Sequence, residues 1–174
     1  MFLLPSHCPY ALSDRIPSDE IATIPCCRAE RTVSFYSRTD EPPLCACPGE
    51  EVYRFAWLSS FDGFAYVRIT REGEEITLKR KYFRLGANPR PVSLALSTAE
   101  WQRFKSALEV ASFWLLDPID RRLLLDGAQW TIEGRIADRY HAVEQQSPEK
   151  GTLHDLGRLF FDFAGPPLSS VRLY

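Results

Sequence analysis

The sequence has no long hydrophobic run and almost no excess of charge. Lys and Arg number 21 against 23 Asp and Glu, a net charge of −2. Proteins that bind duplex nucleic acid usually carry a basic excess or a basic stripe, so we expect no nucleic-acid partner. No segment approaches the ~18–20 consecutive apolar residues that a membrane-spanning helix requires, so we expect no membrane span.

The usual motifs of catalysis and cofactor binding are also absent. The sequence has no Gly-x-Gly-x-x-Gly or Gly-x-x-x-x-Gly-Lys run, the loops that hold nucleotide phosphates, and no Gly-x-Ser-x-Gly turn of a serine hydrolase. It has three histidines, and none shows the His-x-x-x-His spacing of a helical metal site. We therefore expect no cofactor.

Cysteine and proline are present but unevenly distributed. All five cysteines and seven of the thirteen prolines lie in the first 48 residues. Proline removes backbone donors and favours an extended conformation in the residue before it, while the many apolar residues here argue against a purely solvated tail. We interpret residues 1–50 as an irregular N-terminal arm that wraps a single domain formed by residues 51–174.

The beginning of the sequence does not have the pattern of a secretory signal. Pro5 interrupts a short apolar stretch, and no positive charge precedes that stretch. An odd number of cysteines would leave one unpaired in an exported protein. These features predict a cytoplasmic location, with the periplasm as the alternative.

Four cysteines in the arm are close enough in sequence to be weighed as zinc ligands: Cys26, Cys27, Cys45 and Cys47. Structural zinc sites usually separate paired ligands by two to four residues, because the chain must turn around the metal. These pairs are adjacent or separated by one residue. We therefore expect thiols without a metal, with a zinc site at these four residues and a disulfide as the alternatives.

Residues 51 onward show regular secondary-structure patterns. Alternating residues and tight turns predict a three-strand antiparallel meander at 52–59, 64–71 and 75–83. In the second of these strands, Ala65, Val67 and Ile69 should share one face and Phe64, Tyr66 and Arg68 the other. A later hairpin is expected at 129–133 and 140–144.

Two helices complete the predicted domain. Ser97 and Glu100 have the spacing of a capping box, and the apolar stripe of the helix that follows is Trp101, Phe104, Leu108, Ala111 and Leu115. We expect Asp117-Pro118 to end this helix. Thr152 and Asp155 predict a second capping box, before a last helix that stops at Gly165. The expected fold is α+β, an antiparallel sheet with two helices on one face in the order βββ-α-ββ-α.

One polar pair in the later hairpin is a candidate for chemistry. If the turn is centred on Ala137, Glu133 and His141 are cross-strand neighbours, and the carboxylate would raise the pKa of the imidazole. With Asp126 nearby, the pair can be interpreted as an acid–base couple, as an anchor for a partner, or as an ordinary polar pair on a solvated face. A register shift of one residue would separate them.

Residues 95–165 resemble a group of small bacterial proteins with no established activity. The resemblance lies in the segments Phe113-Trp114-x-Leu116, Leu125-Asp126-Gly127-Ala128-x-Trp130-x-x-Glu133-Gly134, Tyr140-His141-x-Val143 and Ser147-Pro148. In physical terms Gly127 permits a turn, and Trp130 fills the space beneath a helix. Some small acidic α+β proteins of bacteria act as immunity proteins, which neutralise a toxin delivered between cells, and by analogy this is a candidate role.

Together these patterns favour a non-enzymatic protein that binds another protein, with a toxin as the candidate partner. The candidate contacts are Tyr66, Arg68, Trp130, Glu133 and His141. A small hydrolase-like enzyme using Glu133, His141 and Asp126 is the first alternative. A structural or assembly component that docks through the N-terminal arm is the second.

Overall fold

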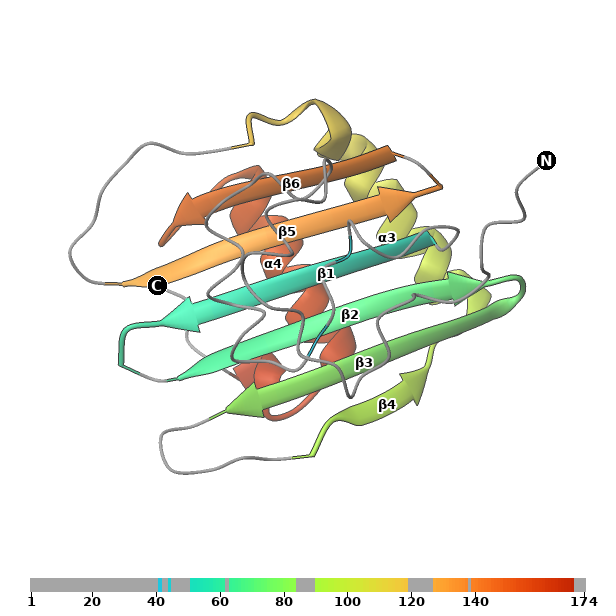
Figure 1. Cartoon of the computed structure of the whole chain (residues 1–174), viewed down its shortest axis with the longest axis horizontal. Helices are drawn as coiled ribbons and strands as arrows, with labels where there is room; N and C mark the ends of the chain where they lie inside the picture. Colours follow the sequence, from blue (N-terminus) through green and yellow to red (C-terminus); the bar gives the residue numbers. More distant parts are fainter. Residues whose placement is uncertain are drawn as a thin grey trace, which may run out of the picture.

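A six-stranded antiparallel sheet covered on one side by two α-helices forms the core of the structure (Figure 1). This computed structural model describes residues 41, 44, 51–61, 63–83, 90–118, 127–137 and 139–170. The predicted α+β class, with antiparallel strands and two helices on one face, is confirmed. Within the predicted arm, only Glu41 and Leu44 are among the described residues. The four candidate zinc ligands are not among them.

The sheet joins an N-terminal meander to a C-terminal hairpin. The strands are β1 (Glu51–Ser59), β2 (Phe64–Glu72), β3 (Glu75–Phe83), β4 (Val92–Ala95), β5 (Ala128–Ile136) and β6 (Arg139–Gln146). The helices are α3 (Thr98–Val110) and α4 (Thr152–Ala164), with short 3-10 helices η3 (Phe113–Leu115) and η4 (Leu168–Ser170). The strand order is β4-β3-β2-β1-β5-β6, so the hairpin adds to the free side of β1.

The predicted element order lacks β4, which forms one edge of the sheet. This strand has only four residues, and all four are exposed. A run of four residues directly after Pro91 is too short to show an alternating pattern. The strand forms because the chain pairs back along β3, with Leu94 opposite Leu78.

The face of the sheet that carries the helices is packed with aromatic side chains. Tyr53, Phe55 and Trp57 alternate along β1 and are fully buried. The ring centroid of Phe55 lies 5.1 Å from that of Phe161 in α4, and the Tyr53 centroid lies 5.2 Å from that of Phe104 in α3. The period of two in a strand therefore places every second side chain of β1 on the helix side of the sheet.

Helix α4 packs tightly against the sheet at Gly157. A Cβ atom at this position would lie 2.5 Å from Cζ3 of Trp130 and 2.9 Å from Cζ of Phe55. Glycine therefore lets the helix backbone rest directly on two rings. Trp130 thus fills the space beneath α4.

The helix ends agree only partly with prediction. The capping box of Ser97 and Glu100 is present in both directions. The second predicted box is wrong, because the N-cap of α4 is Gly151 and no side chain caps this end. Helix α3 ends at Val110 rather than at Asp117-Pro118, and a left-handed Ser112 turns the chain, so that Leu115 is 82% exposed instead of continuing the apolar stripe.

Candidate functional site

The predicted pairing of Glu133 with His141 is wrong. The turn of the β5–β6 hairpin has two residues between Ile136 and Arg139, so Glu133 lies opposite Ala142 and His141 lies opposite Gly134. This one-residue shift relative to the expected centre places the two side chains on opposite faces of the sheet. The acid–base couple is therefore not formed.

His141 packs on the helix side of the sheet against η3. Its ring centroid lies 5.2 Å from that of Phe113 and 6.2 Å from that of Trp114. Desolvation lowers the pKa of His141, and it outweighs a hydrogen bond with the Leu116 backbone that raises the pKa. Its Nε2 atom is buried and has no hydrogen-bond partner among the described residues. This environment favours a neutral imidazole.

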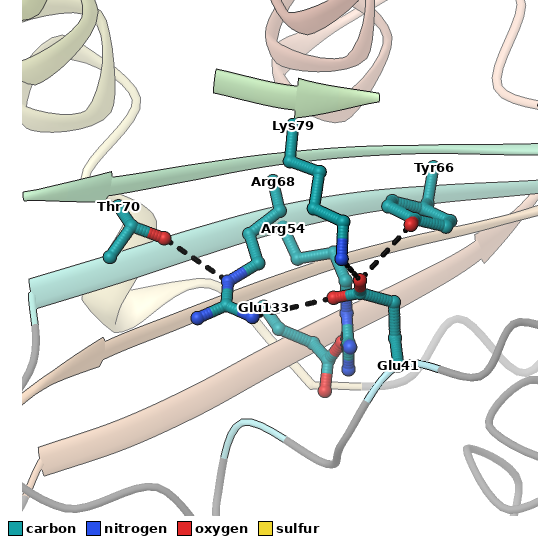
Figure 2. Close-up of polar contacts among 7 residues, drawn as sticks. All are labelled: Glu41, Arg54, Tyr66, Arg68, Thr70, Lys79 and Glu133. Carbon is teal, nitrogen blue, oxygen red and sulfur yellow. Dashed lines mark hydrogen bonds and ion pairs between the residues drawn. The ribbon is translucent and has the colours of Figure 1, made fainter. Parts of the chain in front are cut away.

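The other side of the sheet, which we call the outer face, carries a row of charged residues. Lys79 of β3 lies opposite Arg68 of β2, Arg68 lies opposite Arg54 of β1, and Arg54 lies opposite Glu133 of β5. Like charges directly opposite each other in a sheet are destabilising. The three cations therefore require anions close by, and two carboxylates of the described residues lie beside them (Figure 2).

Glu133 is the first carboxylate and is paired with Arg54. Its Oε2 atom accepts hydrogen bonds from Nε and Nη2 of Arg54 at 2.8 and 2.6 Å. Its Oε1 atom accepts one from the Tyr140 hydroxyl at 2.8 Å. Both side chains of the ion pair are fully buried. A buried pair of this kind depends on having its hydrogen bonds satisfied, which the contacts with Tyr140 and Arg54 provide for Glu133.

Glu41, which precedes β1 in the chain, is the second carboxylate. Figure 2 shows its side chain pointing toward the outer face, with the carboxylate directed at Lys79, Arg68 and Tyr66. Its Oε1 atom contacts Nζ of Lys79 at 2.6 Å and accepts a hydrogen bond from the Tyr66 hydroxyl at 3.0 Å. Its Oε2 atom lies 3.5 Å from Nη1 of Arg68. Three donors from two strands thus meet at one carboxylate.

The electrostatics keep Glu41 ionised and Tyr66 protonated. Burial alone would raise the pKa of Glu41, but the charges of Arg68, Lys79 and Arg54 outweigh burial and lower it below its usual value. Burial and the neighbouring Glu41 charge raise the pKa of Tyr66. The phenol therefore remains a donor to the carboxylate.

An open hollow of about 230 Å³ lies beside this cluster. It is lined by Arg68, Thr70, Glu72, Glu75, Thr77, Lys79 and Ser93. Arg68 and Lys79 are 16% and 23% exposed, whereas the Glu41 side chain is 1% exposed. Solvent therefore reaches the two cations far more readily than it reaches the carboxylate between them.

All four residues of the edge strand β4 are exposed. The Leu96 amide donates to the Ile76 carbonyl at 2.9 Å. Hydrogen-bonded and non-hydrogen-bonded pairs alternate in an antiparallel ladder, so Leu94 and Val92 also point their backbone groups toward β3. Ser93 and Ala95 point theirs outward.

The opposite edge of the sheet has a further backbone contact. The Glu144 amide of β6 donates to the Pro118 carbonyl at 2.9 Å. In the described ranges, no such contact is made with the outward groups of β4, whose Val92 and Leu94 side chains are 43% and 38% exposed.

The structure brings together three of the predicted site residues and separates the others. Tyr66, Arg68 and Glu133 share the outer face, where Arg68 is partly exposed and Tyr66 and Glu133 are buried. Trp130 is fully buried on the helix side. Asp126 lies outside the described residues. Sequence reasoning missed Glu41, Arg54 and Lys79. The alternation of Arg54 with Tyr53 and Phe55 is the signal that could have placed Arg54 on the outer face.

No protein family model matches the chain, and no curated protein matches it. The helices in the described ranges include none that is long and apolar enough to cross a membrane. In the same ranges, no three His, Cys, Asp or Glu side chains come together as metal ligands would.

Proposed function

We propose that this chain is a non-enzymatic protein that binds an extended segment of another protein along β4. Strand addition uses the outward backbone groups of a sheet edge for affinity and alternate side chains for specificity. The observation that carries the proposal is the exposure of all four β4 residues at an edge that no described residue covers.

The chemistry of β4 supports this proposal. Exposed edge strands promote unwanted pairing, and proteins commonly protect them with charge, proline or a covering segment. The β4 sequence Val-Ser-Leu-Ala has no charge and no proline within the strand. Val92 and Leu94 add two partly exposed apolar side chains on one side of it. An edge of this composition suits a partner strand with apolar residues at alternate positions.

A narrower proposal within this class is a bacterial immunity protein that neutralises a toxin. It rests on the residues that resemble small bacterial proteins and on the size and mild acidity of the chain. The hydrolase alternative is less well supported, since Glu133 and His141 face opposite sides of the sheet. Docking through the N-terminal arm remains a separate hypothesis, which depends on residues outside β4.

The test is affinity purification from the native host with two matched variants of the edge strand. Ser93→Pro removes an outward N–H group while leaving the pairing of β4 with β3 intact, because proline is tolerated on the open side of an edge strand. Ser93→Ala keeps that N–H group and serves as the control. We expect a specific protein to co-purify with the wild type and the alanine variant and to be lost with the proline variant.

Two results would contradict the proposal. One is a partner that co-purifies equally with all three proteins, which would place the interface elsewhere. The other is the recovery of no partner at any salt concentration. Circular dichroism and thermal unfolding of each variant show whether the fold is retained before the comparison is made.

A further inference from the structure

We propose that Tyr66, Arg68 and Lys79 form a receptor for one carboxylate group, which Glu41 occupies and which an external carboxylate can occupy in its place. The receptor belongs to the outer face and not to the edge of β4. Its test is therefore independent of the strand-addition proposal.

The donors are arranged around both oxygens of the bound group. One oxygen of Glu41 contacts Lys79 Nζ at 2.6 Å and the Tyr66 hydroxyl at 3.0 Å, and the other lies 3.5 Å from Arg68 Nη1. The donors come from the neighbouring strands β2 and β3, and Arg68 is further held by a 3.1 Å hydrogen bond from its Nε to Thr70. A receptor built on paired strands keeps its shape without help from its ligand.

The charge of the row explains why this position needs an anion. Lys79, Arg68 and Arg54 are consecutive across three strands, and Glu133 pairs with Arg54 at the end of the row. Arg68 and Lys79 face each other at one rung of the sheet, and the Glu41 carboxylate reduces their repulsion. An external anion at the same place would relieve this repulsion.

The hollow gives a small solute access to the receptor, and its charges favour one class of anion over another. Arg68 and Lys79 line it and are partly exposed, so a small solute can reach them from solvent. Glu72 and Glu75 line it as well and lie opposite each other at the end of the β2–β3 hairpin. These acids disfavour a second negative charge, which selects a singly charged carboxylate over a doubly charged phosphate. With Glu41 in place, its carboxylate already occupies the position between the three donors.

The experiment is chemical rescue of Glu41→Ala by acetate. We measure thermal unfolding of the full chain in sodium acetate and in sodium chloride at equal ionic strength near neutral pH. A ligand that binds only the folded state raises the melting temperature. We expect acetate to raise the melting temperature of Glu41→Ala by on the order of 3 °C. The melting temperature of the wild type should change little.

Two further variants make the result specific. Glu41→Gln fills the same space with an amide, so acetate should not stabilise it. Glu41→Ala combined with Lys79→Met lacks one donor, so its response to acetate should be lost. An equal acetate response in the wild type and Glu41→Ala, or an undiminished response in the double variant, would overturn the proposal.

Folding of the alanine variant is itself informative. If Glu41→Ala folds only when acetate is present, the proposal is supported. If it stays unfolded at every acetate concentration while Glu41→Gln folds, the proposal is contradicted. A short capped peptide with one glutamate, compared with its glutamine counterpart, then shows whether a carboxylate on a polypeptide replaces acetate.

Discussion

Glu41 lies far from the outer face in sequence but supplies one of the two described carboxylates that contact the three cations there. Lys79 and Arg68 are direct neighbours across β2 and β3, and the carboxylate bridges them from a position 38 residues before Lys79 in the chain. A pair of adjacent cations would otherwise cost stability. The side chain of Glu41 therefore ties the chain before β1 to the sheet.

Replacing Glu41 by glutamine should destabilise the protein by about 1–3 kcal/mol at pH 7, because a buried charged partner of two cations is lost. The pKa of Glu41 is lowered in the folded state, so its contribution is fully present above its unfolded pKa and is lost as the pH falls through the lower folded pKa. Urea unfolding of wild type and Glu41→Gln between pH 7 and pH 3 measures this. The difference between the two proteins should shrink in acid, and a difference that grows would contradict the assignment.

His141 should contribute a separate pH dependence at higher pH. Its folded pKa is lowered by desolvation, so the unfolded chain takes up a proton first and stability declines as the pH falls from about 6.5 toward the folded pKa. We expect the free energy of unfolding of His141→Gln to change less over this pH range than that of the wild type. Equal pH dependence in the two proteins would show that His141 does not titrate differently on folding.

At the scale of single elements, the contact of α4 with the sheet depends on one missing side chain. Gly157→Ala would place a methyl group 2.5 Å from Cζ3 of Trp130. Alanine favours helix by ~1 kcal/mol over glycine, but overpacking costs about 1–3 kcal/mol. We expect a net loss of stability in chemical denaturation, whereas Gln102→Ala on the exposed side of α3 should change little. A stabilised Gly157→Ala variant would mean that α4 can shift away from the sheet.

The elements that sequence reasoning predicted correctly are those with a long local pattern. The three meander strands and the capping box of Ser97 and Glu100 each depend on residues close together in the chain. Strand β4 and the hairpin register were missed because they depend on pairing with β3 and on the length of one turn. A shift of one residue was enough to move His141 to the opposite face from Glu133.

At the scale of the whole molecule, the two faces of the sheet differ in a way that composition does not show. One face packs aromatic rings against α3 and α4, and the other carries a row of ion pairs. Tyr66, Arg68 and Glu133 were predicted as contacts of a partner, and their place on one face follows from strand alternation. Their link to Glu41 could not be predicted, because no local pattern connects position 41 with β2 or β3.

The open edge at β4 is the feature of the whole molecule on which the proposed function depends. If a partner adds a strand there, its backbone must bond the outward groups of Ser93 and Ala95, while Leu94 stays bonded to β3. Strand addition at β4 should therefore change the hydrogen bonding of alternate amides only, those of Ser93 and Ala95.

Amide hydrogen exchange tests most directly whether the partner adds a strand at β4. Exchange in the purified complex is compared with exchange in the protein alone. We expect exchange at Ser93 and Ala95 to slow markedly when the partner is bound, while the amide of Leu94 is protected in both samples. Unchanged exchange at Ser93 and Ala95 in a fully formed complex would contradict the assignment of β4 as the binding edge.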